Sequence, residues 1–350
     1  MSQYIGVDIH SKFSQVCVME KDGQVVREVR LEHDDPVGVE EFFGDVAEGS
    51  QVTMEATCGW MWLSDVLEEL GHQVHLAHPA GVALIAQSRL KTDKVDARAL
   101  AQLLRTGFLP EAYRAPGAVR DQRLLLRYRQ ALVAIRTGLK NRVHALLMRY
   151  NVHMEQSDIF GAKGTPLLRG LDLPGAGRRV LDGYLDCIEF LNEKIAQHER
   201  HLGEVLESDA RVELLRSLPG VGRLTAYFLV AEIGEIGRFP SAKKLVSYCG
   251  LCPSTRASAR MLMHGRTGPA GRSLLKWSLV EAAHTAVKRD SYFAKVFHRV
   301  ARKRGNQKAY VAVARKMAEM IWRMMVEQRP YEAKRKQSRV GPAVAVVVRS

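Results

Sequence analysis

The order of short apolar segments in the first third of the chain most constrains its fold. Residues 3–9, 14–20 and 24–30 are rich in Val and Ile, and Lys-Asp-Gly at 21–23 forms a turn before the third of them. This pattern predicts three successive antiparallel strands. The following segments alternate between helical and strand patterns: a helix over 36–47, a strand at 51–54, a helix over 60–70 and a strand at 73–77. We therefore expect an α/β domain in which helices cover a sheet.

Helical periodicity replaces the strand pattern in the rest of the chain. Residues 119–150 place apolar side chains at helical spacing with Arg and Lys on the other faces, which predicts a long basic helix. Residues 181–206 alternate acidic and basic side chains, as in a helical hairpin or coiled-coil arm. We expect the following divisions: an α/β domain over 1–115, a basic helical and coiled-coil region over 116–210, a mostly helical domain over 211–330 and a basic tail over 331–350.

Charge is distributed unevenly between these parts. The 350 residues carry a formal net charge of +14, but residues 1–110 contain 9 basic and 17 acidic side chains, a net of −8, so the remainder nets +22. A surface this basic favours a polyanionic partner, because binding releases counterions from phosphate backbones. The acidic part would repel DNA unless metal ions intervene.

The sequence also indicates where the protein works. It contains no run of roughly 20 apolar residues, the length of a membrane span, and its N-terminus does not resemble a signal peptide. Its five cysteines are an odd and scattered set, which argues against a disulfide framework. We expect a cytoplasmic protein without a membrane partner.

Four acids from three distant segments form a candidate metal site. Asp8 lies in the first strand, where Gly6 leaves room for a close approach, and Glu55 ends the next buried strand. Asp93 and Asp96 lie one turn apart at the start of a helix that Thr92 is expected to cap. Each acid alone has a structural explanation, such as the helix dipole for Asp93 and Asp96. Together they offer the hard oxygen ligands that two-metal phosphoryl transfer requires.

A Pro-Gly-x-Gly turn at 219–222 precedes an apolar helix. Gly220 and Gly222 allow the backbone to approach a phosphate, and the next helix would point its N-terminus at it. This pattern is typical of helix-hairpin-helix-like elements that bind DNA, although a plain turn between two helices also explains it.

Three motifs containing the acids resemble those of a known family. GVDIHSK (6–12), MEATCGW (54–60) and LKTDKVDARALAQLLR (90–105) are similar to the acidic motifs of the DEDD-type insertion-sequence transposases. The resemblance covers most of the chain. It implies an RNase H-like (RuvC-like) N-terminal domain in which Asp8, Glu55, Asp93 and Asp96 hold Mg²⁺ or Mn²⁺. It also implies a recombinase that a non-coding bridge RNA guides.

The stretch from 239 to 287 carries the rest of the resemblance. Gly-Leu-Cys-Pro at 250–253 leads to Ser258, which the resemblance implies is the nucleophile that forms a covalent link to DNA. Its neighbours are Ala257 and Ala259 where the family has Ser and Gly, so Ser254 stays a second candidate. Metal coordination would activate the hydroxyl in place of a His base. The strand to be cut would bind basic side chains nearby, namely Arg256, Arg260 and Lys276.

We therefore predict a transposase that cuts and rejoins donor and target DNA under the direction of a guide RNA. Because the acids and Ser258 lie in different domains, the resemblance implies a site completed by docking and a homo-oligomer, a dimer or a tetramer. Three alternatives stay open: a RuvC-like structure-specific nuclease, an actin-like ATPase whose first strand also reads Ile-Gly-Val-Asp, and a nucleic-acid-binding module without catalysis. The ATPase would need a Gly-rich adenosine motif where this chain has long basic helices.

Overall fold

The computed structural model describes residues 3–57, 59–85, 92–258, 261–267 and 273–332; over 254–258, over 261–267 and at 273 it describes the backbone alone. The chain divides after Ala115 into two compact units, each with its own core. None of the helices in these ranges combines the length and the apolar character that a membrane span requires. The basic tail lies outside the described residues from 333 onward.

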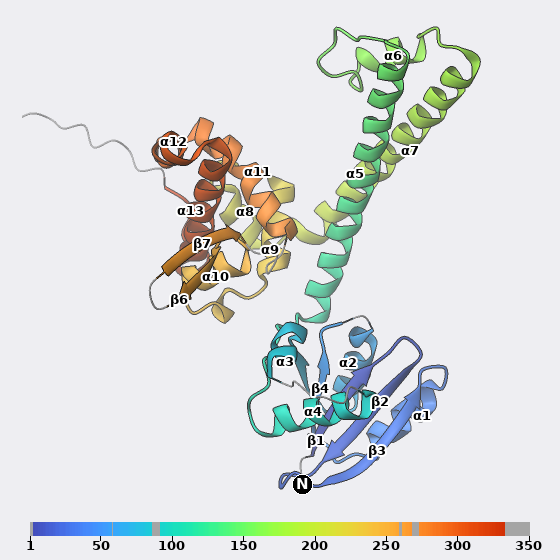
Figure 1. Ribbon diagram of the computed structural model, residues 1–350, viewed down its shortest axis with the longest axis vertical. Helices are drawn as coiled ribbons and strands as arrows, with labels where there is room; N and C mark the ends of the chain where they lie inside the picture. Colours follow the sequence, from blue (N-terminus) through green and yellow to red (C-terminus); the bar gives the residue numbers. More distant parts are fainter. Residues whose placement is uncertain (1–2, 58, 86–91, 259–260, 268–272, 333–350) are drawn as a thin grey trace, which may run out of the picture. The chain divides into compact units, whose positions relative to one another are not determined.

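The first unit is built on a five-stranded sheet (Figure 1). Its strands are β1 (Tyr4–Ile9), β2 (Phe13–Met19), β3 (Val25–Glu32), β4 (Gln51–Glu55) and β5 (Gln73–Ala77), in the order β3-β2-β1-β4-β5. The first three strands pair antiparallel, and β4 and β5 join them in parallel. Its helices are α1 (Pro36–Gly44), α2 (Trp60–Glu69), α3 (Pro79–Ile85) and α4 (Asp93–Arg105). The predicted strands and longer helices are confirmed; α3 had not been predicted.

The two faces of the sheet pack against different helices. Ile5 and Val7 belong to a core that includes Phe43 of α1 and Leu63 of α2. On the opposite face, α4 lies against β1 so closely that a Cβ atom at Gly6 would come within 2.0 Å of the Ala97 carbonyl oxygen. Gly6 is therefore what allows the start of α4 to reach the strand that carries Asp8.

The second unit begins with a helical hairpin, which we call the arm: α5 (Gly117–Arg149), the short helix α6 (Gly164–Arg169) and α7 (Gly175–Leu206) (Figure 1). The buried residues of α7 include Leu181, Ile188, Ile195 and Leu202, one every seven residues, as in a coiled coil. The arm was predicted from the sequence, but α7 begins six residues earlier than expected because Gly175 and Gly177 are accommodated within the helix.

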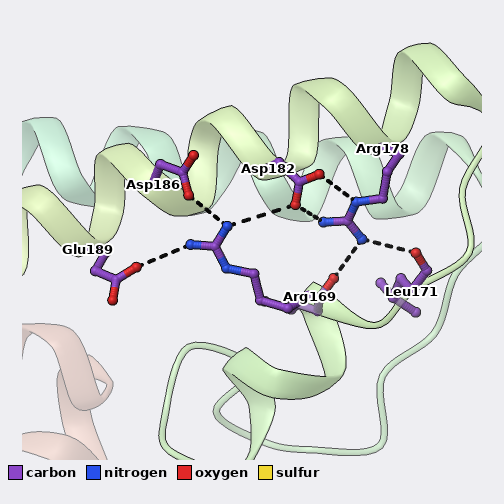
Figure 2. Close-up of polar contacts among 7 residues, drawn as sticks. Arg169, Leu171, Arg178, Asp182, Asp186 and Glu189 are labelled. Carbon is purple, nitrogen blue, oxygen red and sulfur yellow. Dashed lines mark hydrogen bonds and ion pairs between the residues drawn. The ribbon is translucent and has the colours of Figure 1, made fainter.

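Charged side chains fasten the tip of the arm (Figure 2). Arg169 of α6 pairs with Asp186 of α7 at 2.6 Å and with Glu189 at 3.2 Å. Arg178 pairs with Asp182 and donates hydrogen bonds to the Leu168 and Leu171 carbonyl oxygens at 2.9 and 3.0 Å. These contacts hold the segment before α7 against the helix itself.

The remaining elements of the second unit surround its largest core. They are α8 (Ala210–Arg216), α9 (Arg223–Ile233), a 3-10 turn η1 (Ile236–Arg238), α10 (Ala242–Tyr248), β6 (Pro253–Ser258), β7 (Met261–Thr267), α11 (Ser273–Arg289), α12 (Ser291–Arg304) and α13 (Asn306–Glu327). The prediction of a mostly helical region is confirmed, but it missed the antiparallel hairpin β6–β7. The end of α9 is fixed by Arg123 of α5, which donates to the Ala231 and Glu232 carbonyl oxygens at 2.8 and 3.1 Å.

Candidate metal centre

Two of the four predicted acids lie at the same edge of the sheet. Strands β1 and β4 are parallel and pair Val7 with Met54, so Asp8 and Glu55 are the next residues along neighbouring strands. Val7 and Met54 both belong to the core beneath α1 and α2. Because side chains alternate along a strand, Asp8 and Glu55 leave the sheet on the opposite face, the face that α4 covers.

The other two acids lie in the first turn of α4. Thr92 caps this helix by accepting a hydrogen bond from the Val95 amide at 3.4 Å, which confirms the predicted start of the helix. Asp93 and Asp96 follow the cap directly. Both lie near the positive end of the helix dipole, where acidic side chains are common.

His10 brings two of these acids together. Its Nε2 atom lies 3.1 Å from Asp8 Oδ2 and 3.4 Å from Asp93 Oδ1. One ligand atom from each of Asp8, His10 and Asp93 lies within 4.8 Å of the other two, a spacing that a single ion can span. The His10 ring also stacks on Phe13, with centroids 4.5 Å apart. His10 was missed in the sequence, although its place two residues after Asp8 is a signal that it shares the face of that acid.

The electrostatics of Asp8 reflect this crowding of like charges. Burial raises the pKa of Asp8, and the interaction with His10 opposes that effect. The negative charges of Asp96 and then Asp93 raise the pKa further. Asp8, Asp93 and Asp96 therefore act on one another electrostatically.

These donors suit a divalent cation. Carboxylate oxygens are the preferred ligands of Mg²⁺ and Mn²⁺, and an imidazole nitrogen is compatible with Mn²⁺. A cation at this edge would offset the repulsion between Asp8, Asp93 and Asp96 that otherwise opposes their convergence. Glu55 is placed at this site by its position at the end of β4, beside Asp8 on β1.

Ser258 lies in a different kind of setting. It is the last residue of β6 and pairs with Met261, so it adjoins the turn of the hairpin rather than lying in a polar loop. Arg256 and Ser254 belong to the same strand, and only the backbone of these three residues is described. Arg260 lies outside the described residues. Lys276 is half-buried near the start of α11.

The Pro-Gly-x-Gly turn joins α8 to α9, and its two glycines differ. Gly220 has a φ of +90°, and a Cβ atom there would lie 2.2 Å from the Ala282 carbonyl oxygen of α11. Internal packing therefore accounts for Gly220. Gly222 precedes the first residue of α9, and among the described residues, its chain neighbours aside, no atom lies within 4 Å of the point where its Cβ would be. Gly222 is thus the residue of this turn where a phosphate would meet no steric obstacle.

Comparison with known proteins gives matches along most of the chain. A DEDD-type IS110 family model described as a transposase matches residues 5–152, and a model of the transposase IS116/IS110/IS902 family matches residues 212–298. The transposase for insertion sequence element IS1111A of Coxiella burnetii is 28% identical over 338 residues, covering 93% of this chain and 90% of that protein. The transposase for insertion sequence element IS1328 of Yersinia enterocolitica is 25% identical, covering 91% of this chain and 95% of that protein.

A shorter match is to a protein named for gene inversion and not for transposition. The pilin gene-inverting protein of Moraxella bovis is 28% identical over 155 residues, covering 42% of this chain and 48% of that protein. The mixed α/β first unit and the mostly helical second unit agree with a DEDD-type, RNase H-like domain followed by the transposase segment. The chain therefore belongs to the IS116/IS110/IS902 family of insertion-sequence transposases, enzymes that recombine DNA.

Proposed function

We propose that Asp8, Glu55, Asp93 and Asp96 hold Mg²⁺ or Mn²⁺ and that this site serves the cutting and rejoining of DNA strands. The observation that carries the proposal is the convergence of Asp8, His10 and Asp93 at the start of α4. The family assignment supports it, since its first model is of the DEDD type. When the metal binds, His10 either becomes a further ligand or moves away so that the ion takes its position between Asp8 and Asp93.

Each acid has a distinct source of rigidity in this proposal. Asp8 and Glu55 are fixed by the register of two parallel strands, and Asp93 and Asp96 by the capped first turn of α4. When bound, a pair of divalent cations supplies Lewis-acid activation of the attacking oxygen and stabilises the leaving oxygen. The protein's part is to hold the carboxylates where the scissile phosphate enters.

Ser258 is the proposed nucleophile. Its Oγ atom forms a bond to phosphorus as the bond between phosphorus and a deoxyribose oxygen breaks; Ser258 loses its proton, and the released deoxyribose oxygen gains one. Attack by the hydroxyl of another strand reverses the step and frees Ser258. Arg256, Arg260 and Lys276 would hold the strand, together with a backbone contact at Gly222. The name of the pilin gene-inverting relative is in keeping with cutting followed by rejoining.

The proposed function also includes a guide RNA. The net charge of +22 on residues 111–350 supports a second polyanionic partner beside DNA. If a guide is needed, strand exchange between donor and target plasmids will require RNA transcribed from the sequence beside the reading frame. Treatment of the complex with ribonuclease will then stop the reaction, and activity that survives full RNA removal would contradict this step.

The test of the metal centre compares Asp8→Asn and Asp93→Asn with Asp34→Asn, an exposed acid of the same unit. We expect the first two variants to lose roughly 1,000-fold in metal-dependent strand exchange, since several kcal/mol of charge stabilisation is removed. They should also lose Mn²⁺ binding in calorimetry, whereas Asp34→Asn keeps both. Equal activity in all three would refute the role of Asp8 and Asp93 as metal ligands in strand exchange.

The test of the nucleophile compares Ser258→Ala with Ser254→Ala. Ser258→Ala should abolish the covalent protein–DNA adduct seen on denaturing gels while nucleic-acid binding is unchanged. Ser254→Ala should keep the adduct. An adduct that persists in Ser258→Ala would refute the role of Ser258 as the nucleophile. Strand cleavage that is never followed by rejoining would favour a metal-dependent nuclease instead. The actin-like ATPase alternative has no support from the matches to transposases.

A further inference from the structure

A pocket in the arm has the side chains of a nucleic-acid site. It lies between α5 and α7, has a volume of about 490 Å³, and its lining includes Arg142, Leu146, Arg149, Tyr150 and Tyr184. The Tyr150 ring enters because α7 has no side chain at that point: a Cβ at Gly177 would lie 2.7 Å from the ring. The pocket thus combines arginine side chains, tyrosine rings and a small apolar surface.

The two arginines of this pocket differ from Arg169 and Arg178, which lie near the tip of the arm. Arg169 and Arg178 are neutralised by Asp182, Asp186 and Glu189 (Figure 2). Within the described part of the chain, Arg142 and Arg149 form no ion pair or hydrogen bond, and the pocket lining contains no acid. Their positive charge is therefore available to a ligand, and the lining does not oppose an anion.

The spacing of the arginines indicates what kind of anion fits. Arg142 and Arg149 lie seven residues apart on α5, which places their backbones about 10.5 Å apart along the helix axis. Two side chains at this separation can contact two different phosphates of one strand, unlike a clamp on one small anion. The apolar Leu146 lies between them in sequence, and Tyr184 faces the pocket from α7.

We propose that this pocket binds a single-stranded segment of nucleic acid, with phosphates at Arg142 and Arg149 and an unpaired base against Tyr184. Aromatic rings beside a basic track are the common means of binding single strands, because every base offers a π face. A duplex keeps its bases stacked within the helix, so it gains the phosphate contacts alone. DNA and RNA share the phosphate and the base face, and either sugar suits the pocket. The site shares no residue with the proposed metal ligands and does not depend on them.

The experiment uses the full chain in EDTA, so that its result is independent of the metal centre. Binding of a labelled oligothymidine and of an RNA strand of equal length is measured over a range of salt concentrations. The variants are the double substitution Arg142→Ala/Arg149→Ala and the single substitution Tyr184→Leu, which keeps an apolar side chain. Arg200→Ala removes an exposed, unpaired arginine of α7 outside the pocket and serves as the matched control.

We expect the double variant to lower the slope of log affinity against log salt by about 1.4, since each lost phosphate contact on a single strand removes about 0.7. Tyr184→Leu should weaken single-strand binding roughly 5- to 150-fold and leave duplex binding unchanged. Arg200→Ala should change neither quantity. Thermal unfolding of each variant verifies that the arm remains folded.

Four outcomes overturn the proposal. They are a wild-type slope in the double variant, an equal fall in Arg200→Ala, a loss restricted to duplex DNA, and displacement of the strand by inorganic phosphate at constant ionic strength. The last result would mark the pocket as a site for a small anion. This result does not depend on the Asp8→Asn test, because EDTA removes the metal from the wild type and from every variant alike.

Discussion

The edge of the N-terminal sheet and the junction of α5 with α9 both remove charged groups from water, but they compensate them differently. At the junction, Glu232 is 2% exposed and lies between two arginines, with Arg127 Nη2 at 2.9 Å from Oε1 and Arg123 Nε at 3.9 Å from Oε2. At the sheet edge, Asp8, Asp93 and Asp96 share one sign, and the contact described for two of them is to His10.

The difference separates charges that serve the fold from charges that serve a ligand. Arg127 and Arg123 together offset the charge of Glu232, so this buried group of charges is costly to break. The negative charges of Asp93 and Asp96 repel that of Asp8 at the sheet edge. Their convergence therefore does not stabilise the folded chain by itself. Carboxylates that converge in this way without a compensating cation are typical of functional sites.

The largest expected effect comes from breaking the compensated pair. Arg123→Met removes a guanidinium that is 6% exposed, together with its hydrogen bonds to the end of α9. We expect a loss of about 3–5 kcal/mol in the free energy of unfolding, because Glu232 keeps its burial but loses a counter-charge. Urea denaturation measures it, with Arg200→Met as the exposed control. A loss below 1 kcal/mol would remove the contrast between the two regions.

A smaller effect is expected where the sheet edge depends on close packing. At Gly6→Ala the added Cβ would come within 2.5 Å of the Ala101 backbone nitrogen and closer still to Ala97, so α4 must move away from β1. We expect a loss of about 1–3 kcal/mol in stability and reduced strand exchange, since Asp93 and Asp96 move with the helix. Gly44→Ala, where no atom lies within 4 Å of the added Cβ, is the control. Full activity in Gly6→Ala would show that the acids need not be held so tightly.

The smallest effect has the opposite sign. Without metal, Asp8→Asn should stabilise the protein by less than about 1 kcal/mol, because it removes a half-buried charge that Asp96 and Asp93 repel. Addition of Mn²⁺ should then raise the melting temperature of the wild type but not of the variant. Calorimetric unfolding in EDTA and in Mn²⁺ measures both. If Asp8→Asn is less stable in EDTA, Asp8 belongs with Glu232 as a residue the fold requires.

Local rules explain why the sheet and its acids were predictable. The strand pattern depends on period-two apolar residues and Gly turns, and the start of α4 on a Thr cap, all of which act within a few residues. Parallel pairing then places Asp8 beside Glu55 once β1 and β4 are recognised as neighbours. The convergence of these two segments with Asp93 and Asp96 was a prediction from chemistry and resemblance.

The misses have equally specific causes. Strand β6 carries Pro, Ser, Thr and Arg with little alternation of apolar and polar residues, so its pairing with β7 left no clear trace in the sequence. The start of α7 was placed too late because glycines normally oppose a helix, yet Gly177 is tolerated where the Tyr150 ring needs its space. The role of Gly220 in packing against α11 depends on a contact 62 residues away, which no local rule reveals.

The seven-residue repeat of α7 has a consequence for the length of the arm. Because Leu181, Ile188, Ile195 and Leu202 recur at equal intervals, deletion of one repeat from α7 and of seven matched residues from α5 would re-form the same seam. Each such deletion shortens the hairpin by about 10.5 Å. Related chains can therefore change the reach of this part in fixed steps without altering the sheet or the core of the C-terminal helices.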